Sequence, residues 1–475
     1  MPESVPESGH RAATPAAPGE RRSIRRVVGA SLVGTTIEWY DFFLYGSAAA
    51  LVFNTLFFPE SDPLTGTLLA FTTYAIGFLA RPLGGLVFGH FGDRTGRKRL
   101  LVISLLLMGG STFLIGLLPT HAQIGAAAPV LLTLLRLVQG FALGGEWGGA
   151  VLIVAEHGDR GRRGFWASWP QAGAPGGNLL ATAVLAVMAG TLSDSAFESW
   201  GWRVPFLLSG ILVGIGLWIR LAVSESPVYR EAEARARASA RTERPPALEV
   251  LRHQWREVLV AMGARMGENV GYYVITAFVL VFAENQTDLP RGSVLNAVLI
   301  GSAVHFVTIP LWGAASDRFG RRPVYLTGAL GIAVWAWPFF GLVATGGFGA
   351  TTLAVTVGLV LHGAMYGPQA AFFSELFGTR VRYSGASIGY QLASILAGGI
   401  APLVATALLG ATGSAVPVAV YVGAAGLISA VAVRLARETR GTDLDFEADG
   451  AGAHPAPAGL VKPRAHGDGA LPVGD

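Results

Sequence analysis

Two acidic residues within an apolar stretch near the N-terminus are the first candidates for chemistry. Glu38 and Asp41 lie three positions apart, so a helix places both carboxyl groups on one face, and Tyr45 extends the same stripe. Burial disfavours the charged form of a carboxyl group, which then holds a proton more readily. Either acid can therefore carry a coupling proton, with Asp41 the favoured one. The alternative is a structural hydrogen bond to a neighbouring helix.

A second polar stripe carries Arg136, Gln139 and Glu146. A helix rises about 1.5 Å per residue, so Arg136 and Glu146 lie roughly 15 Å apart and cannot pair directly. A guanidinium binds a carboxylate through two parallel hydrogen bonds, which suits Arg136 to an organic-acid substrate. Pairing with a protein acid such as Asp41 or Glu38 is an equal alternative. Glu146 is a further candidate for proton coupling.

A third stripe contains Arg265, Glu268 and Tyr272. Arg265 and Glu268 are spaced to neutralise each other within a helix, and this stands beside a role in binding. Tyr272 either covers a substrate or serves as ordinary packing. His305 and His362 are each interpreted as hydrogen-bonded core histidines in preference to proton relays. Three more polar residues suit hydroxyl or carboxylate ligands: Gln171, Tyr366 and Gln391.

The elements that position these residues are predicted to be transmembrane helices. The chain has 475 residues, of which 52% are hydrophobic and only 14% charged, whereas soluble proteins carry about 25% charged residues. Ionisable groups inside spans are costly and usually functional. Windows of roughly 20 apolar residues predict twelve spans, at about 27–54, 64–90, 100–118, 129–156, 165–190, 203–223, 257–283, 293–315, 324–344, 350–374, 384–410 and 414–434.

The composition also excludes several classes of protein. Cysteine is absent, which excludes disulfides, thiolate metal sites and a cysteine nucleophile. No phosphate-binding loop or histidine pair at metal spacing is present in the sequence, so we expect no cofactor, no metal and no enzymatic activity. The basic residues are not clustered on a soluble face, and a nucleic-acid partner is not expected.

The basic residues predict the orientation in the membrane. Thirty of the 35 Lys and Arg residues fall on the side that holds both termini, and only Arg203 and Arg291 fall on the other side. The positive-inside rule therefore places both termini in the cytoplasm, in a multi-pass protein of the cell membrane. Residues 1–26 and 437–475 are predicted to be disordered.

An internal repeat divides the chain. The loop Gly89-x-x-x-Asp93-Arg94-x-x-Arg97 recurs as Gly313-x-x-x-Asp317-Arg318-x-x-Arg321, 224 residues later. This predicts two six-helix bundles, 27–223 and 257–436, joined by a polar linker at 224–256. Repeats of this kind place a substrate site between the halves near the midplane, and rocking of the halves gives alternating access.

The loop around Asp93 is similar to the signature loop of the major facilitator superfamily, and Arg136-Leu-Val-Gln139-Gly140 resembles its second motif. Four further segments, 37–42, 81–85, 146–149 and 374–377, resemble the metabolite:proton symporter family. Members of that family carry shikimate, α-ketoglutarate, citrate, or proline and betaine. The resemblance spans about residues 25–440 and implies an all-α fold of twelve transmembrane helices.

The resemblance also implies gating residues, because the signature loops lock the two halves together when such a transporter faces outward. The candidates are Asp93, Arg94, Arg97, Asp317, Arg318 and Arg321. Arg81, which precedes Pro82, is expected to have a structural or gating role in preference to substrate contact.

These observations predict a secondary active transporter, a monomer in the lipid bilayer, that takes up a small organic acid with protons. A shikimate-like acid or a dicarboxylate such as α-ketoglutarate fits the buried arginines. The alternative is a symporter of a zwitterionic osmolyte, although residues 441–475 show no heptads of the coiled coil found in osmosensing relatives. A drug-efflux antiporter is less favoured.

Overall fold

The computed structural model describes residues 18–95, 97–144, 154, 160–222, 250, 252–378 and 382–442, and every regular element in these ranges is a helix. A helix satisfies its backbone hydrogen bonds internally, which apolar surroundings demand. Of the helices in these ranges, nine are long and apolar enough to cross a membrane, or ten if one bent pair counts as a span.

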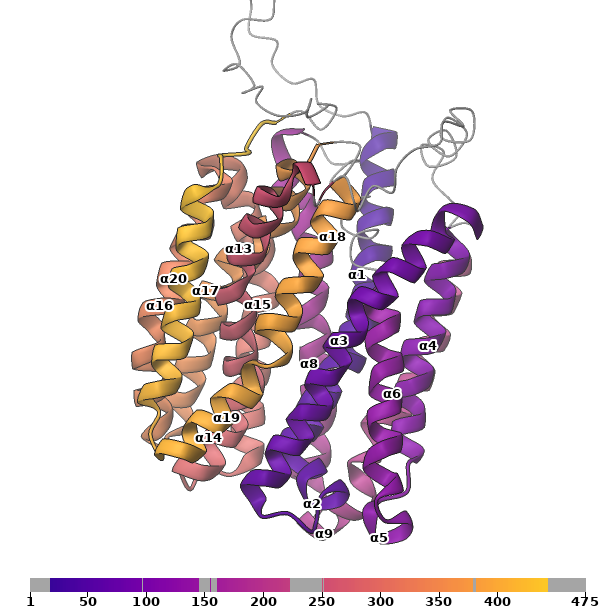
Figure 1. The fold of residues 1–475 in the computed structure, drawn as a ribbon, viewed down its shortest axis with the longest axis vertical. Helices are drawn as coiled ribbons and strands as arrows, with labels where there is room; N and C mark the ends of the chain where they lie inside the picture. Colours follow the sequence, from indigo (N-terminus) through magenta and orange to yellow (C-terminus); the bar gives the residue numbers. More distant parts are fainter. Residues whose placement is uncertain are drawn as a thin grey trace, which may run out of the picture.

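The first half of the chain forms one bundle, drawn in indigo to magenta in Figure 1. Its elements are α1 (Pro18–Ala48), η1 (Ala49–Phe53), α2 (Asn54–Phe57), α3 (Pro63–Thr95), α4 (Arg97–Leu117), α5 (His121–Ile124), α6 (Ala127–Gly144), η2 (Arg160–Arg162), α8 (Arg163–Thr191), α9 (Asp194–Ala196), η3 (Phe197–Gly201) and α10 (Arg203–Ala222).

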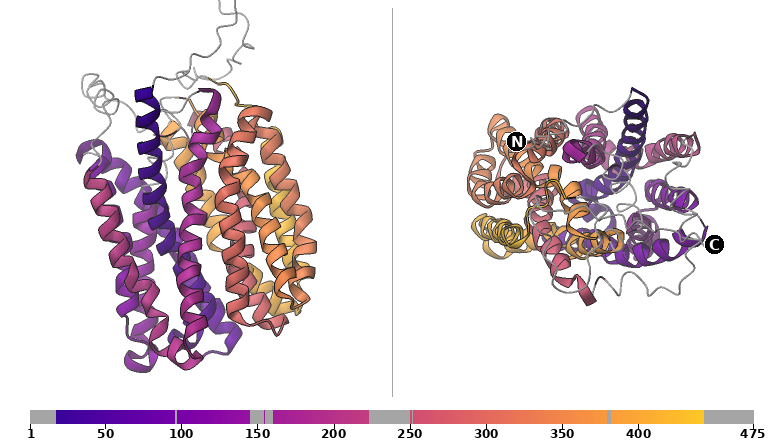
Figure 2. Two further views of the ribbon diagram at one scale, coloured as in Figure 1. Left: turned by 180° about the vertical axis from the view of Figure 1, so that it is seen from behind. Right: turned by 90° about the horizontal axis from the view of Figure 1, so that it is seen from above.

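The second half forms the other bundle, drawn in red to yellow. Its elements are α13 (Trp255–Tyr273), η4 (Val274–Phe278), α14 (Val279–Gln286), α15 (Arg291–Phe319), α16 (Arg321–Ala344), α17 (Phe348–Leu376), α18 (Arg382–Ala393), η5 (Ser394–Gly399), α19 (Ala401–Thr412) and α20 (Val416–Leu435). Seen from above, the two groups lie side by side (Figure 2), and α8 packs along α15 and α17 across the interface. We call the end where α1 begins and α20 ends the terminal face.

The termini differ in part from the expectation. α1 begins at Pro18, so a portion of the N-terminal stretch predicted to be disordered is helical. Residues 437–442, expected in the C-terminal tail, fold back against α16 and α17. The other residues of these two stretches, and most of the predicted linker at 224–256, lie outside the described residues.

Three spans that carry candidate residues are interrupted by π-helical turns. η1 follows α1, η4 follows α13 and η5 follows α18. Such insertions occur mostly as single turns inside α-helices and frequently at functional sites. Two of the interrupted spans, α1 and α13, carry polar stripes predicted from the sequence, and α18 carries Gln391.

Glycines bring α3 and α6 into backbone contact. A Cβ atom added at Gly140 would lie 1.8 Å from the carbonyl oxygen of Gly77, and one at Gly84 would lie 1.8 Å from the carbonyl oxygen of Phe141. Small residues allow this close approach of helices in membranes.

We expect Gly140→Ala to lower the thermal stability of the detergent-solubilised protein, because the new methyl group forces α3 and α6 apart. Overpacking of this kind costs about 1–3 kcal/mol. Gly110→Ala on α4 is the matched control, since a Cβ atom there meets nothing within 4 Å. Thermal unfolding of both variants checks the expectation, and equal stabilities would contradict it.

Candidate functional site

A buried arginine lies at the centre of the first bundle. The Arg136 side chain is fully buried, and its guanidinium lies 4.4 Å from the ring centres of Phe42 and Tyr45 and 4.6 Å from that of Tyr74. Its Nη1 donates a 3.0 Å hydrogen bond to Oε1 of Gln139. Among the described residues, Nε and Nη2 have no hydrogen-bond partner. These two nitrogens form one edge of the guanidinium, the geometry that binds a carboxylate by two parallel bonds.

A chain of hydrogen bonds leads from this arginine towards Asp41. Nε2 of Gln139 donates to Oγ1 of Thr112 at 2.6 Å, and the Thr112 hydroxyl, which donates to the carbonyl oxygen of Met108 at 3.1 Å, also lies near the Asp41 carboxyl group. Ser209 donates to Oδ1 of Asp41 at 2.5 Å. The direct Arg136–Asp41 ion pair weighed from the sequence is absent from the described contacts, and the two groups are joined through neutral side chains.

The other residues predicted on these stripes are also buried. Tyr45 is hydrogen bonded to Thr73 at 2.6 Å, and Glu38 is 5% exposed. Glu146 lies outside the described residues, as do the side chains of Asp93, Arg94 and Arg97.

A second buried arginine lies in the other bundle. Nη2 of Arg265 lies 3.5 Å from Oε2 of Glu268, so the ion pair predicted from their spacing is confirmed. Nη1 of Arg265 donates to Oε1 of Gln369 at 2.9 Å, and the guanidinium stacks 3.3 Å from the ring centre of Tyr390. Each bundle thus holds an arginine bound to a glutamine and covered by aromatic rings.

The two histidines join this second cluster. Nδ1 of His362 lies 2.9 Å from Nε2 of His305, and Nε2 of His362 lies 3.3 Å from Oε1 of Glu268. Both are hydrogen-bonded and buried, as expected, but they bond to each other and to an acid. These contacts join residues 57 and 94 positions apart, and no local spacing in the sequence indicates them.

An aromatic layer separates the two clusters at the interface of the bundles. The ring centres of Phe43 and Tyr272 lie 5.2 Å apart, and those of Phe78 and Tyr273 lie 5.8 Å apart. The Arg81 guanidinium lies 4.0 Å from the ring centre of Phe78. Within the described ranges, Nε and Nη2 of Arg81 have no hydrogen-bond partner. From the sequence we expect a structural or gating role for Arg81, and its side chain lies in this layer.

Three predicted ligands cross the same interface. Nε2 of Gln171 donates to the carbonyl oxygen of Tyr366 at 3.5 Å, and Nε2 of Gln391 donates to that of Gly144 at 3.1 Å. Asn178 adds a 3.0 Å bond to Ser302. The polar groups expected near a substrate therefore lie where the bundles meet.

A network of charged groups joins the bundles at the terminal face. The Asp317 carboxylate accepts 2.8 Å hydrogen bonds from the backbone N–H groups of Gly164 and Phe165, at the start of α8. Arg321 bonds Asp317 at 2.7 Å and Glu375 at 3.1 Å. Arg163, from the first bundle, reaches Glu375 at 2.9 Å. We call the set Arg163, Asp317, Arg321 and Glu375 the latch.

The chain after α20 reinforces the latch. Glu438 accepts hydrogen bonds from the backbone N–H groups of Arg321 and Arg322 at the start of α16, and Thr439 donates to Glu375 at 2.8 Å. Glu438 was missed from the sequence because it lies in a segment predicted to be disordered. Arg318, in contrast, is exposed and stacks on Phe319, away from the latch.

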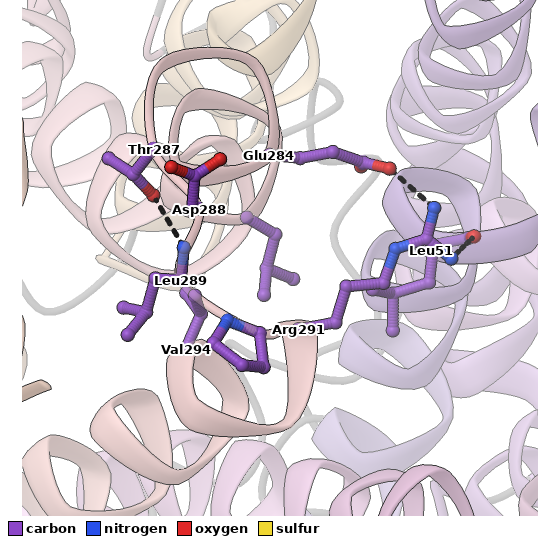
Figure 3. A pocket seen from close by; sticks show the side chains of 9 residues that line it. Leu51, Glu284, Thr287, Asp288, Leu289, Arg291 and Val294 are labelled. Carbon is purple, nitrogen blue, oxygen red and sulfur yellow. Dashed lines mark hydrogen bonds and ion pairs between the residues drawn. The ribbon is translucent and has the colours of Figure 1, made fainter. Parts of the chain in front are cut away.

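A cavity of about 250 Å³ lies at the opposite face, beside the second bundle (Figure 3). Arg291 extends across it, pairs with Glu284 and donates to the carbonyl oxygen of Leu51 at 3.4 Å. Since Leu51 belongs to the first bundle, this contact joins the two halves at that face. The bundles are therefore held together at both ends around the buried polar interior.

Two helical bundles with apolar surfaces, a buried polar interior and contacts at both ends define a multi-pass membrane transporter. The profile of the Major Facilitator Superfamily matches residues 31–397, and the chain belongs to this superfamily. The Shikimate transporter of Escherichia coli (strain K12) is 42% identical over 418 residues, which cover 88% of this chain and 95% of that protein.

Two further comparisons agree. The Glycine betaine/proline/ectoine/pipecolic acid transporter OusA of Dickeya dadantii (strain 3937) is 35% identical over 398 residues, 81% of this chain and 78% of that protein. The solved structure of the proton:xylose symporter XylE bound to 6-bromo-6-deoxy-D-glucose has a TM-score of 0.71 at 19% identity, covering 90% of this chain and 98% of that one. The predicted superfamily and fold are confirmed, and the chain is a transporter and not an enzyme.

Proposed function

We propose that this transporter takes up a small organic acid, shikimate-like or a dicarboxylate, together with protons. The observation that carries the proposal is the buried Arg136 guanidinium, whose open edge is linked through Gln139 and Thr112 to the Asp41 carboxyl group. A buried cation without a counter-ion is costly. The carboxylate of a substrate would supply that counter-ion.

The linkage suggests how proton and substrate are coupled. The Thr112 hydroxyl accepts from Gln139 and donates either to Asp41 or to the carbonyl oxygen of Met108, 3.1 Å away. A proton on Asp41 removes the negative charge that attracts this hydroxyl. The Thr112 hydroxyl then reorients, and its hydrogen bond with Gln139 transmits this reorientation to the Arg136 guanidinium that holds the substrate. Arg81 in the aromatic layer offers a second open edge to the same anion.

The remaining assignments belong to the same proposal. Glu38 is the second candidate to carry the coupling proton. The path of the substrate is lined by Tyr45, Gln171, Tyr272, Tyr366 and Gln391. The bundles 27–223 and 257–436 rock about it in the cell membrane, with the terminal face in the cytoplasm and one chain as the transporting unit.

A zwitterionic osmolyte is the second candidate, favoured by the aromatic layer. Faces of Phe and Tyr bind quaternary ammonium groups by cation–π attraction. Arg81 already occupies the faces of Phe42 and Phe78, at 4.4 and 4.0 Å, and disfavours another cation there. We therefore place the organic acid first.

Uptake of radiolabelled compounds into proteoliposomes tests the proposal. The panel is shikimate, α-ketoglutarate, citrate, proline and betaine, under an imposed inward pH gradient. Accumulation of an acid that a protonophore abolishes supports it. Accumulation of betaine or proline alone would show that the substrate is an osmolyte and not an organic acid. Uptake that does not depend on the pH gradient would refute proton coupling.

The latch gives a prediction about gating. Asp317→Asn weakens the charge-assisted bonds to α8 and Arg321, each worth about 1.5–3 kcal/mol, so the terminal face should open at least about tenfold more often. In this naturally cysteine-free chain, Ser168→Cys places a thiol where α8 meets Gly313 of α15. Asp317→Asn should speed its labelling by an impermeant maleimide from the terminal side. Asp288→Asn at the opposite face is the control, and equal labelling rates would exclude a gating role for Asp317.

A further inference from the structure

We infer that the second bundle contains a proton-binding relay, His305–His362–Glu268, that is separate from Asp41. The inference rests on the proposed proton-coupled uptake and adds a second site at which a proton binds. The three side chains come from α15, α17 and α13, so the relay exists only in the folded bundle. They are at most 4% exposed.

The hydrogen-bond pattern fixes the direction of the relay. An ionised Glu268 only accepts hydrogen bonds, so Nε2 of His362 carries the proton in the 3.3 Å contact with Oε1. In a neutral His362, Nδ1 is then the acceptor, and Nε2 of His305 must donate to it across 2.9 Å. This leaves Nδ1 of His305 as a bare acceptor, and among the described residues it has no partner although the ring is fully buried.

That bare nitrogen is the entry point for a proton. A proton that binds Nδ1 of His305 makes the ring an imidazolium, which can pass its Nε2 proton to Nδ1 of His362. His362 can in turn pass its own Nε2 proton to Oε1 of Glu268. One proton enters at His305 and one arrives at Glu268, and both histidines end neutral, with the hydrogen bonds of the chain reversed.

The surroundings allow Glu268 to change its charge. Oε2 of Glu268 accepts 3.2 Å and 3.3 Å hydrogen bonds from the neutral amides of Asn269 and Gln369. α8, which packs against α15 and α17, contributes the neutral side chains of Gln171 and Asn178. The charged and titratable neighbours on the packed helices are Arg265 and Tyr272 of α13, Tyr325 of α16, Tyr366 of α17 and Tyr390 of α18.

Protonation of Glu268 has a direct consequence for Arg265. The ionised pair at 3.5 Å is neutral, and a proton on Glu268 leaves Arg265 with an uncompensated buried charge. A substrate carboxylate restores neutrality at the same place. The relay therefore supplies a second proton for each substrate anion, in addition to the proton bound at Asp41.

Proton stoichiometry is the test. In proteoliposomes with the membrane potential held at zero, the equilibrium accumulation of shikimate changes by n decades per unit of pH gradient, where n is the number of coupled protons. We expect n near two in the wild type and near one in His305→Gln and His362→Gln. Shikimate counterflow at equal pH shows that the variants are folded. His121→Gln, on the opposite face, should leave n unchanged.

Unchanged n in both variants would overturn the relay while leaving proton-coupled uptake intact. A wild-type n of zero would refute the proposed function instead, and the two failures are thus distinct. Nitrogen-15 spectra of the histidines in lipid give a readout independent of transport. The relay requires Nε2–H forms of both rings at alkaline pH and a change of both rings to Nδ1–H forms upon acidification, with signals assigned by the same two variants. A protonated Nδ1 on His305 at alkaline pH would overturn it.

Discussion

Asp41→Asn will remove one coupled proton and so lower the accumulation of substrate against a gradient, while exchange of substrate across the membrane continues. Asparagine can still accept the hydrogen bond from Ser209 and is nearly the same size as aspartate, so the packing of α1 against α10 is kept. It cannot bind or release a proton. The variant therefore separates the movement of substrate from the proton coupling that depends on Asp41.

The expected effect is large. One pH unit is worth about 1.4 kcal/mol per coupled proton, or roughly a tenfold ratio of substrate concentrations. With a gradient of about two units, one proton per substrate corresponds to an accumulation of about a hundredfold, and loss of coupling by this site lowers the ratio by that factor. Uptake in proteoliposomes under a pH gradient measures accumulation, and counterflow at equal pH measures exchange.

Asp62→Asn is the matched control for Asp41. Asp62 is an exposed acid that accepts a 3.1 Å hydrogen bond from the backbone N–H of Thr65 at the start of α3. Its replacement should change neither accumulation nor exchange. If Asp41→Asn accumulates substrate as the wild type does, Asp41 is not a coupling residue.

Local spacing was enough to predict some of the site. The interval of three between Arg265 and Glu268 makes an ion pair on one helix, and the structure contains it. The apolar runs predicted transmembrane helices, and nine helices of the described residues are long and apolar enough to cross a membrane. Such features depend only on the sequence of a single helix or on the membrane that surrounds it.

Features built from several helices could not be predicted in this way. His305 and His362 read as two unrelated core residues because their helices are neighbours only in the folded bundle. Glu438 caps α16 from a segment whose composition indicates disorder. Arg81 stacks on Phe78 of its own helix and on Phe42 of α1, and the contact with Phe42 could not be predicted from any pattern within α3.

Each bundle contains a buried arginine in a similar environment, and the two environments differ in one respect. Arg136 and Arg265 each bond a glutamine and lie over aromatic rings, but only Arg265 has an acid within 4 Å among the described residues. Arg136 is consequently the buried cation with more to gain from an anionic substrate. This difference leads to a prediction in which function and stability change independently.

Arg136→Met should abolish substrate binding without destabilising the protein. Methionine fills much of the space of the arginine stem, and no described carboxylate is left unpaired when the charge is removed. Replacing buried charges by apolar groups of similar volume is often neutral or stabilising. We therefore expect an unchanged or higher temperature of thermal unfolding in detergent.

Binding should weaken strongly, because both open donors of Arg136 are lost together. Hydrogen bonds to charged groups contribute about 1.5–3 kcal/mol each, so two of them correspond to a rise in Kd of at least roughly a hundredfold. Arg136→Lys is the informative partner: it keeps the charge and loses the two-pronged geometry. A large loss in both variants indicates bidentate binding, whereas near-normal binding by lysine indicates a role for charge alone. Binding measured by calorimetry with shikimate decides between them, and wild-type affinity in Arg136→Met would remove Arg136 from the substrate site.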